Sequence, residues 1–377
     1  MHTFIVPSAK IILIVLVAAV WSARGAAADD RPTNDQIDQS IDRAIDFLTS
    51  RGQSADGRIG SGNGTAVTSL AVAAVLSHRP DATNQPSIRR AIEFLKNNVR
   101  GDGGIYANGS KYRNYETSVA VSALVRADNA SKGNTEFDSV LDRAEVFLKG
   151  LQWDEGEGVE SSDAAYGGAG YGSHGRPDMS NTSFMLDALT DLGNGPDDEA
   201  IQKALRFVSR SQNLDSPAND TPHADKIDDG GFYYTPAAGG ETKAGTTDGG
   251  GLRSYGSMTY AGLKSMIYAG LTAEDPRVAA ALSFIRRNYD LDQNPGMGAA
   301  GLYYYYHTFA KSLAAAGIDT IDDADGNPHN WRNELAEKLI SQQQPDGSWV
   351  NDQNDRWMEG NRELVTAYAL LALSYVR

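Results

Sequence analysis

The stretch Gln343–Asn351, QQPDGSWVN, decides how the rest of this sequence is interpreted. It follows the frame Gln343-x-x-x-Gly347-x-Trp349, and apolar residues with helical spacing stand on both sides of it. Glycine allows a backbone conformation that a Cβ atom would resist, so this turn can end a helix, and the indole ring can cover the junction with a neighbouring unit. The side-chain amide of Gln343 can form hydrogen bonds with backbone groups that have no partner at a helix end. The stretch therefore predicts a unit of helix, Gly-rich turn and helix.

The same unit occurs five more times along the chain. In each copy an amphipathic segment leads through a Gly-rich turn to a segment rich in small residues. The first segments of these copies include Ile41, Ile88, Leu141, Ile201 and Arg277. Small residues suit inner helices crowded between neighbours, and charged faces suit an outer layer. We therefore expect an all-α fold, an α/α toroid of six helix-pair repeats with an inner and an outer ring (an α6/α6 barrel), as a single domain over residues 29–377.

The first 28 residues are typical of a secretory signal peptide. Lys10 precedes the apolar run 11–21, and the small residues Ala26–Ala28 follow it. We expect cleavage near Ala28 and an exported protein, periplasmic or extracellular; the alternative is an uncleaved N-terminal anchor. The run is short for a membrane span and no second run approaches that length, so the mature protein is not expected to span a membrane.

Charge and cysteine content narrow the possible partners. The net charge is −15, and cleavage near Ala28 would remove two basic residues and leave −17. This balance disfavours nucleic acid and anionic membrane surfaces as partners. The chain has no cysteine, which excludes disulfides, thiol nucleophiles and thiolate metal sites. The segment 322–330 lacks the full spacing of a calcium loop, and we expect neither a metal nor a cofactor.

The repeats resemble those of the terpenoid cyclase and protein prenyltransferase superfamily, whose members are α/α toroids. The frame of Gln343, Gly347 and Trp349 is similar to the Gln–Trp motif of squalene–hopene cyclases. In the other copies the place near the Trp holds Ile59, Tyr106, Phe232 or Leu302. The resemblance covers nearly all of residues 33–377 and implies the toroid fold, whereas toroids serve unrelated chemistries.

Two defining sites of this superfamily are missing from the sequence. The cyclase acid motif Asp-x-Asp-Asp does not occur, because the acidic residues of 322–325 have the wrong order and those of 225–229 the wrong spacing. The prenyltransferase zinc site needs a cysteine, and the chain has none. Cyclase or prenyltransferase activity therefore does not follow from the repeats.

Catalytic candidates are expected where the loops between paired helices converge at one mouth of the ring. The longest of these loops are 154–177 and 212–255. His307, near the start of an inner helix, is the first candidate for proton transfer because histidine titrates near neutrality. Tyr255 and Asp229 are further catalytic candidates. The alternative for His307 is a buried structural histidine.

Candidate ligand-binding residues come from the same loops and first turns. They are Arg176, Asn181, Arg253, Tyr303, Trp357 and Glu363. Arginines could bind a carboxylate or phosphate bidentately, and aromatic faces could stabilise a cation. The alternatives are salt bridges to local acidic residues for the arginines and a place in the core for the aromatic residues. Asp178 or Ser180 is expected to cap the third inner helix.

Three functions remain open. The first is binding of, or action on, an apolar, isoprenoid-like molecule; an enzyme of this kind would be terpenoid cyclase-like, and a central cavity filled by side chains would count against it. The second is a carbohydrate-active toroid, lyase-like or hydrolase-like, that uses tyrosine, histidine and arginine on a glycan. The third is a non-catalytic scaffold for a partner protein, which predicts a large exposed apolar patch without clustered titratable groups.

Overall fold

The computed structural model describes residues 32–60, 62, 64–131, 135–172 and 175–377. The predicted signal peptide, residues 1–28, lies outside them. Residues 32–377 form one compact unit, and its described part contains twelve α-helices. Their bounds are α1 Asn34–Asp46, α2 Ala66–His78, α3 Pro86–Lys96, α4 Arg113–Ala130, α5 Asp138–Lys149, α6 Met179–Asp191, α7 Glu199–Arg210, α8 Gly256–Tyr268, α9 Pro276–Arg287, α10 Leu302–Ala315, α11 Trp331–Gln342 and α12 Arg362–Leu373.

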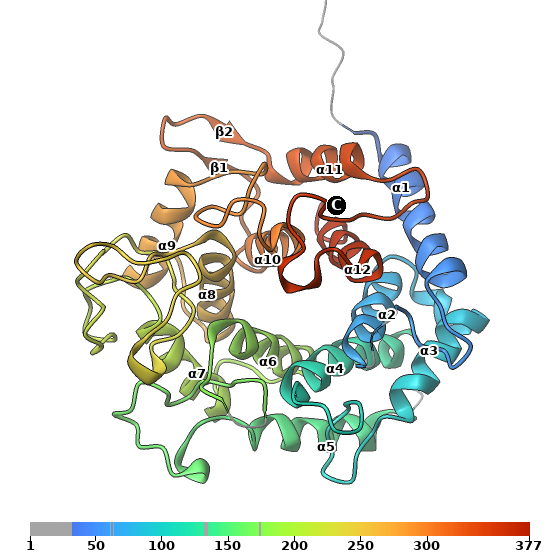
Figure 1. Cartoon of the computed structure of the whole chain (residues 1–377), viewed down its shortest axis with the longest axis horizontal. Coiled ribbons are helices and arrows are strands. Elements are labelled where there is room, and N and C mark those ends of the chain that lie inside the picture. The colour runs from blue at the N-terminus through green and yellow to red at the C-terminus, as the bar shows by residue number, and fades with distance from the viewer. Residues whose placement is uncertain (1–31, 61, 63, 132–134, 173–174) are drawn as a thin grey trace, which may run out of the picture. The chain divides into compact units, whose positions relative to one another are not determined.

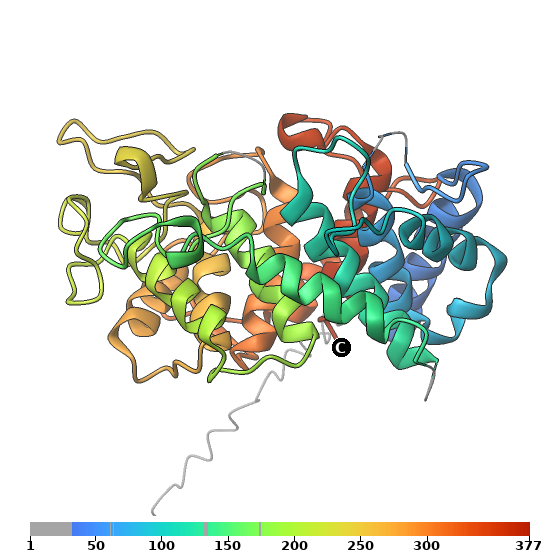
Figure 2. The same ribbon diagram turned by 90° about the horizontal axis from the view of Figure 1, so that it is seen from below.

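The even-numbered helices form a closed inner ring. Each packs on the next from α2 to α12, and α12 packs back on α2, while the odd-numbered helices lie outside them (Figure 1). Seen edge-on in Figure 2, long loops that precede inner helices stand along one edge of this ring. The predicted all-α toroid with an inner and an outer ring is confirmed.

Burial follows the predicted division between the two layers. In α8 every residue from Gly256 to Met266 is buried, as expected of a helix enclosed on all sides. In the outer helix α7 the buried residues Ile201, Ala204, Phe207 and Val208 form one helical stripe, and charged residues occupy the opposite face. Small side chains therefore let inner helices pack closely, while the outer layer meets solvent.

The turn at Gln343 holds the last repeat against the first. The Gln343 amide nitrogen donates to the carbonyl of Gly347, 2.9 Å away, and to that of Ser40 in α1, 2.8 Å away. Gly347 has a φ of 90°, and a Cβ atom there would lie 2.3 Å from the carbonyl oxygen of Arg43, also in α1. The turn thus requires glycine both for its backbone conformation and for the close approach of α1.

The same contacts recur in other repeats. The amides of Gln53, Gln152 and Gln212 each bond a glycine carbonyl in their own turn and a carbonyl of the next outer helix. At the position of Trp349, the backbone N–H donates to a threonine hydroxyl on the inner helix of the same repeat. Within the described residues these threonines are Thr68, Thr117, Thr182, Thr259 and Thr366. The threonine contact was not predicted from the sequence.

Two short strands interrupt the helical pattern between α10 and α11. β1 (Ile321–Asp322) pairs antiparallel with β2 (Pro328–His329), which the sequence analysis did not predict. Two-residue strands are too short to give an alternating pattern, so the sequence carried no signal for them. Short helical turns of π or 3-10 type are η1 Phe47–Arg51, η2 Pro80–Asn84, η3 Glu155–Glu157, η4 Ala237–Gly239 and η5 Arg356–Met358. No helix in the described ranges is both long and apolar enough to cross a membrane.

Candidate functional site

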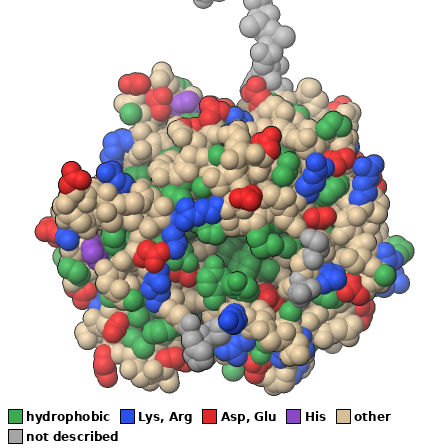
Figure 3. Space-filling view, in the orientation of Figure 1, with side chains coloured by type: hydrophobic (Ala, Val, Ile, Leu, Met, Phe, Trp, Pro, Cys, Tyr) green, Lys and Arg blue, Asp and Glu red, His purple; other side chains and the backbone are tan. Residues whose placement is uncertain are grey.

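The mouth of the ring is the edge at which all inner helices begin. Because the chain alternates between outer and inner helices, the six inner helices run in the same direction, and the loops before them meet at one face. Figure 3 shows that this face is hollowed near its middle. Side chains of the hydrophobic class, to which the figure assigns tyrosine, line the hollow, and Lys and Arg side chains lie beside it. We call this feature the mouth hollow.

Aromatic side chains close the ring axis. Phe184 of α6 contacts Tyr115 of α4, with ring centroids 4.9 Å apart, and Tyr304 of α10, at 6.0 Å. Tyr368 of α12 contacts Tyr304 at 5.9 Å, and its hydroxyl lies 3.1 Å from that of Tyr115. Two of these contacts, Phe184 with Tyr304 and Tyr115 with Tyr368, join inner helices that are not neighbours in the ring, so the four aromatic rings meet across the axis. We call them the aromatic floor.

A buried ion cluster lies beside the aromatic floor. The Asp187 carboxylate is 2.6 Å from the Lys264 ammonium and 2.8 Å from that of Lys311. The two ammonium groups hold the pKa of Asp187 well below its usual range against the effect of burial, while burial lowers the pKa of Lys264 to about 8. His307 is buried here and stacks on the Tyr368 ring at 5.7 Å. Burial and the nearby lysines lower the pKa of His307 to about 3.

Asp178 is a buried acid at the start of α6. Its carboxylate accepts hydrogen bonds from the backbone N–H of Asn181 at 2.9 Å and from the Asn181 side chain at 2.8 Å, so Asp178 is the helix cap. Burial raises the pKa of Asp178 to about 6, although these bonds and one with Tyr234 oppose the rise. The predicted ligand residue Asn181 is therefore a partner of this acid, which holds a proton in mildly acidic solution.

Three basic side chains lie close together near Asp178. Arg176 and Lys243 both pair with the Glu241 carboxylate, and the Arg356 guanidinium stacks on the Trp357 ring at 4.3 Å. Burial and then the positive charges of Arg176 and Arg356 lower the pKa of Lys243. We call these three residues the basic cluster. Among the described residues Glu241 is the one carboxylate that forms an ion pair with this cluster, so the cluster favours a further anion.

A buried glutamate fixes the loop that carries Trp357. Glu359 accepts the backbone N–H groups of Tyr303 at 3.0 Å and Tyr304 at 2.9 Å, at the start of α10. Burial raises the pKa of Glu359 to about 7. Trp357 has a φ of 59° and is 44% exposed, and its ring lies beside Gly301. A strained backbone thus presents a large aromatic side chain at the rim.

The predicted site residues separate into three groups, of which the first lies at the mouth and the second in the interior. Arg176, Asn181 and Trp357 lie at the mouth, and Tyr255 is buried beside Tyr304. His307 lies in the interior next to the ion cluster, where its Nδ1 atom has no hydrogen-bond partner among the described residues.

The remaining predicted residues face other parts of the ring. The Tyr303 hydroxyl donates to Gln342 of the outer helix α11, 3.2 Å away, and Glu363 packs against Gly52 of the first repeat. The Asp229 carboxylate accepts from Ser254 at 2.7 Å, within the turn that contacts α9. Arg253 is exposed and bonds the carbonyl of Thr246 in its own loop. The structure therefore does not join these four to the mouth hollow.

Comparisons with known proteins agree on the fold. Residues 62–233 match the family model for the squalene-hopene cyclase C-terminal domain, and none of the curated proteins matches significantly. The type II terpene cyclase MstE from Scytonema is 15% identical, with a TM-score of 0.52 over 92% of this chain and 98% of that chain. A possible member of the GH105 family from Salmonella enterica is 12% identical, with a TM-score of 0.53 over 91% of this chain and 94% of that chain. A structure described as a glycosidase is 13% identical, with a TM-score of 0.54 over 91% of this chain and 98% of that chain.

These likenesses define the fold of the protein. The chain has the terpenoid cyclase-like α/α toroid fold, and the resemblance seen in its repeats is confirmed. At such low identity the likeness concerns the fold, which the cyclase and the glycosidases share. Because the same fold serves different activities, the residues at the mouth determine any activity of this chain.

Proposed function

We propose that this toroid binds an amphipathic molecule at the mouth hollow. The apolar, isoprenoid-like part lies on the aromatic floor, and an anionic group lies against the basic cluster of Arg176, Lys243 and Arg356. The observation that carries the proposal is the crowding of three cations around one described carboxylate partner, Glu241. The cluster lies near the aromatic floor, because both Arg356 and the floor residue Tyr304 act on the buried Tyr255. Guanidinium groups suit a carboxylate or phosphate, and burial of apolar surface supplies affinity.

The aromatic floor determines how deep such a ligand can lie. A cyclase must enclose its substrate away from water, whereas here Tyr115, Phe184, Tyr304 and Tyr368 meet across the axis. The proposed ligand therefore stays in the open hollow, which favours binding over cyclisation. Asp178 is the group that would transfer a proton if the ligand reacts, because its pKa lies near 6.

A relative supplies a suitable probe. Another structure of MstE, 14% identical with a TM-score of 0.51, is described as a complex with its substrate geranylgeranyl dihydroxybenzoate. That name denotes an isoprenoid chain joined to an aromatic acid, which is the chemistry proposed here. Titration calorimetry with this compound at pH 7.5 should give saturable binding, and uncharged geranylgeraniol should bind more weakly.

Two arginine variants make the test specific. Arg356→Ala should weaken binding of the acid about tenfold or more, because a hydrogen bond to a charged group is worth roughly 1.5–3 kcal/mol. Arg253→Ala is the matched control, since Arg253 is exposed and bonds only within its own loop. Absence of saturable binding, or equal effects of both variants, would refute the proposal.

An acidic glycan is the second candidate ligand, in a carbohydrate-active toroid. The two glycosidase-type structures among the comparisons favour it, as do the exposed rings of Tyr171 and Trp357, on which sugar rings could stack. Oligogalacturonate in the same titration separates the candidates. Glycan binding that is lost in Trp357→Ala, with release of new chain ends, would favour this candidate, and a protein that binds neither probe would fit a scaffold.

The proposed setting is outside the cytoplasm, after cleavage near Ala28. This part of the proposal rests on the predicted signal peptide in residues 1–28. N-terminal sequencing of the protein recovered from cells should begin near Asp29. An intact first residue would favour the alternative of an N-terminal anchor.

A further inference from the structure

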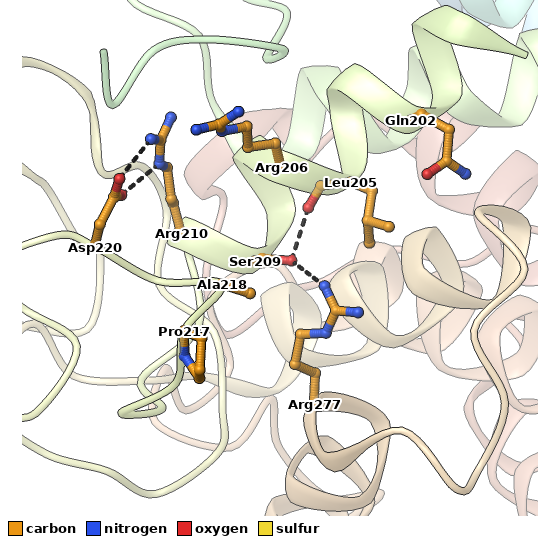
Figure 4. A pocket seen from close by; sticks show the side chains of 9 residues that line it. All are labelled: Gln202, Leu205, Arg206, Ser209, Arg210, Pro217, Ala218, Asp220 and Arg277. Carbon is orange, nitrogen blue, oxygen red and sulfur yellow. Dashed lines mark hydrogen bonds and ion pairs between the residues drawn. The ribbon is translucent and has the colours of Figure 1, made fainter. Parts of the chain in front are cut away.

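A second cavity lies on the outer wall of the ring, among residues that the proposed function does not use. It has a volume of about 260 Å³ and lies between α7 and the start of α9 (Figure 4). Pro217 and Ala218, from the loop after α7, form part of its wall. We call this cavity the outer pocket.

Arginine side chains dominate the charge of the outer pocket. Arg206, Arg210 and Arg277 line it, together with the single carboxylate of Asp220. Asp275, which pairs with Arg277, adds a second negative charge, so three positive and two negative groups leave a net charge of +1. A cationic cavity in a chain with a net charge of −15 is suited to an anion.

Two of the three arginines are held rigidly. The Arg210 side chain is 1% exposed, and its Nε and Nη2 atoms donate to the Asp220 carboxylate at 2.7 and 2.8 Å. Arg277 donates to Asp275 through Nε at 3.0 Å and Nη2 at 2.8 Å, and through Nη1 to the Ser209 hydroxyl at 3.0 Å. The walls of the pocket are therefore organised before any ligand arrives, which reduces the entropy cost of binding.

Arg206 differs from its two neighbours. It is exposed and forms no ion pair among the described residues, although its charge adds to that of Arg210 in lowering the pKa of Asp220. Its guanidinium lies 5.8 Å from the centre of the Tyr166 ring. A guanidinium carries five N–H donors, so Arg206 has donors to offer, and the Nη atoms of Arg277 each keep one. Leu205 and Pro217 add apolar surface to the same cavity.

We propose that the outer pocket binds a small molecule that carries one carboxylate or phosphate group. Its oxyanion lies between Arg206 and Arg277, and its apolar remainder lies against Leu205 and Pro217. The volume is below the roughly 300–1,000 Å³ of sites for drug-sized ligands, so the ligand is small. This site is separate from the mouth hollow and does not depend on the function proposed there.

Titration calorimetry of the whole protein with inorganic phosphate and with butyrate tests this proposal, at constant ionic strength with chloride as the control salt. At least one probe should bind saturably, and chloride should not. Tighter binding of phosphate would indicate a phosphate ligand, and tighter binding of butyrate a carboxylate with an apolar tail. No saturable binding of either probe would overturn the proposal.

Variants show whether the binding is at the outer pocket. Arg206→Ala should weaken it at least tenfold without a change in the thermal unfolding midpoint, because Arg206 supports no described ion pair. Arg286→Ala is the matched control, since Arg286 is exposed on α9 and does not line the pocket. Undiminished binding in both Arg206→Ala and Arg277→Gln would also overturn the proposal, and Arg356→Ala at the mouth should leave this binding unchanged.

Discussion

Replacement of Asp187 by asparagine tests whether the buried ion cluster stabilises the ring. The Asp187, Lys264 and Lys311 side chains are 5%, 3% and 10% exposed, and the carboxylate lies within 2.8 Å of both ammonium groups. Without its charge, two buried cations would lose their carboxylate. Removal of one partner from a buried pair costs about 3–5 kcal/mol, so Asp187→Asn should lower the free energy of unfolding by about that amount at pH 7.

The pH dependence of this loss has a definite sign. Burial lowers the pKa of Lys264 to about 8, so the cluster is fully charged below that pH. As the pH rises through 8, Lys264 loses its proton in the folded protein, and part of the attraction to Asp187 disappears. The difference between the wild-type protein and Asp187→Asn should therefore be largest below pH 8 and shrink above it.

Urea unfolding followed by circular dichroism at pH 6.5, 7 and 9.5 measures both effects. Asp191→Asn is the control, because Asp191 pairs with Arg126 at 3.2 Å where both side chains remain about a fifth exposed. The Asp191→Asn substitution should lower the free energy of unfolding by about 1 kcal/mol or less. A loss below about 1 kcal/mol for Asp187→Asn at pH 7, or one that grows above pH 8, would refute this reasoning.

Three further variants address the turn and two titrating groups. Gly347→Ala should lower the free energy of unfolding by about 2 kcal/mol or more, because its Cβ atom would meet an α1 carbonyl at 2.3 Å; Gly193→Ala, with a φ of 93° but open space, should lose less in the same urea experiment. The pKa of Glu359 is raised, so its contribution to stability is present below about pH 4.5 and is lost as the pH rises through about 7. Thermal melts at pH 4.5, 6 and 7.5 should show a decline of up to roughly 3 kcal/mol that Glu359→Gln does not share. Burial lowers the pKa of His329, but bonds to Asp323 and Glu334 outweigh it and raise the value, so the stabilisation is present below about pH 6.5 and is lost as the pH rises through the raised pKa. His329→Asn should therefore destabilise the protein more at pH 5.5 than at pH 8.5.

The fold was predictable because its signals are local. Helical periodicity, the glycine of each turn and the small residues of each inner helix are written within single repeats, and six copies reinforce one another. The buried ion cluster also had a signal that was overlooked. Asp187 and Lys264 each follow by five residues the threonine that bonds the turn, at Thr182 and Thr259, so lone charges occupy the same register of neighbouring inner helices.

The candidate site was less predictable because loops determine it. Lys243 and Arg356 come from different loops that meet only after folding, and no spacing in the sequence brings them together. For His307 the sequence left two alternatives, proton transfer and a buried structural histidine. Its residue type suggested proton transfer, but its position on the inner face of α10 puts it beside two lysines, where burial leaves it neutral.

The parallel direction of the inner helices explains why three carboxylates accept backbone N–H groups at the mouth. Each helix directs its N-terminus, the positive end of its dipole, toward the mouth. Three carboxylates lie there: Asp178 caps α6, Glu359 accepts the first N–H groups of α10, and Glu116 accepts the N–H of Thr65 at the start of α2. The same field attracts a further anion to the mouth, where the basic cluster adds to it. Anionic probes should therefore bind there more tightly than neutral ones of the same shape, and higher salt should weaken this preference.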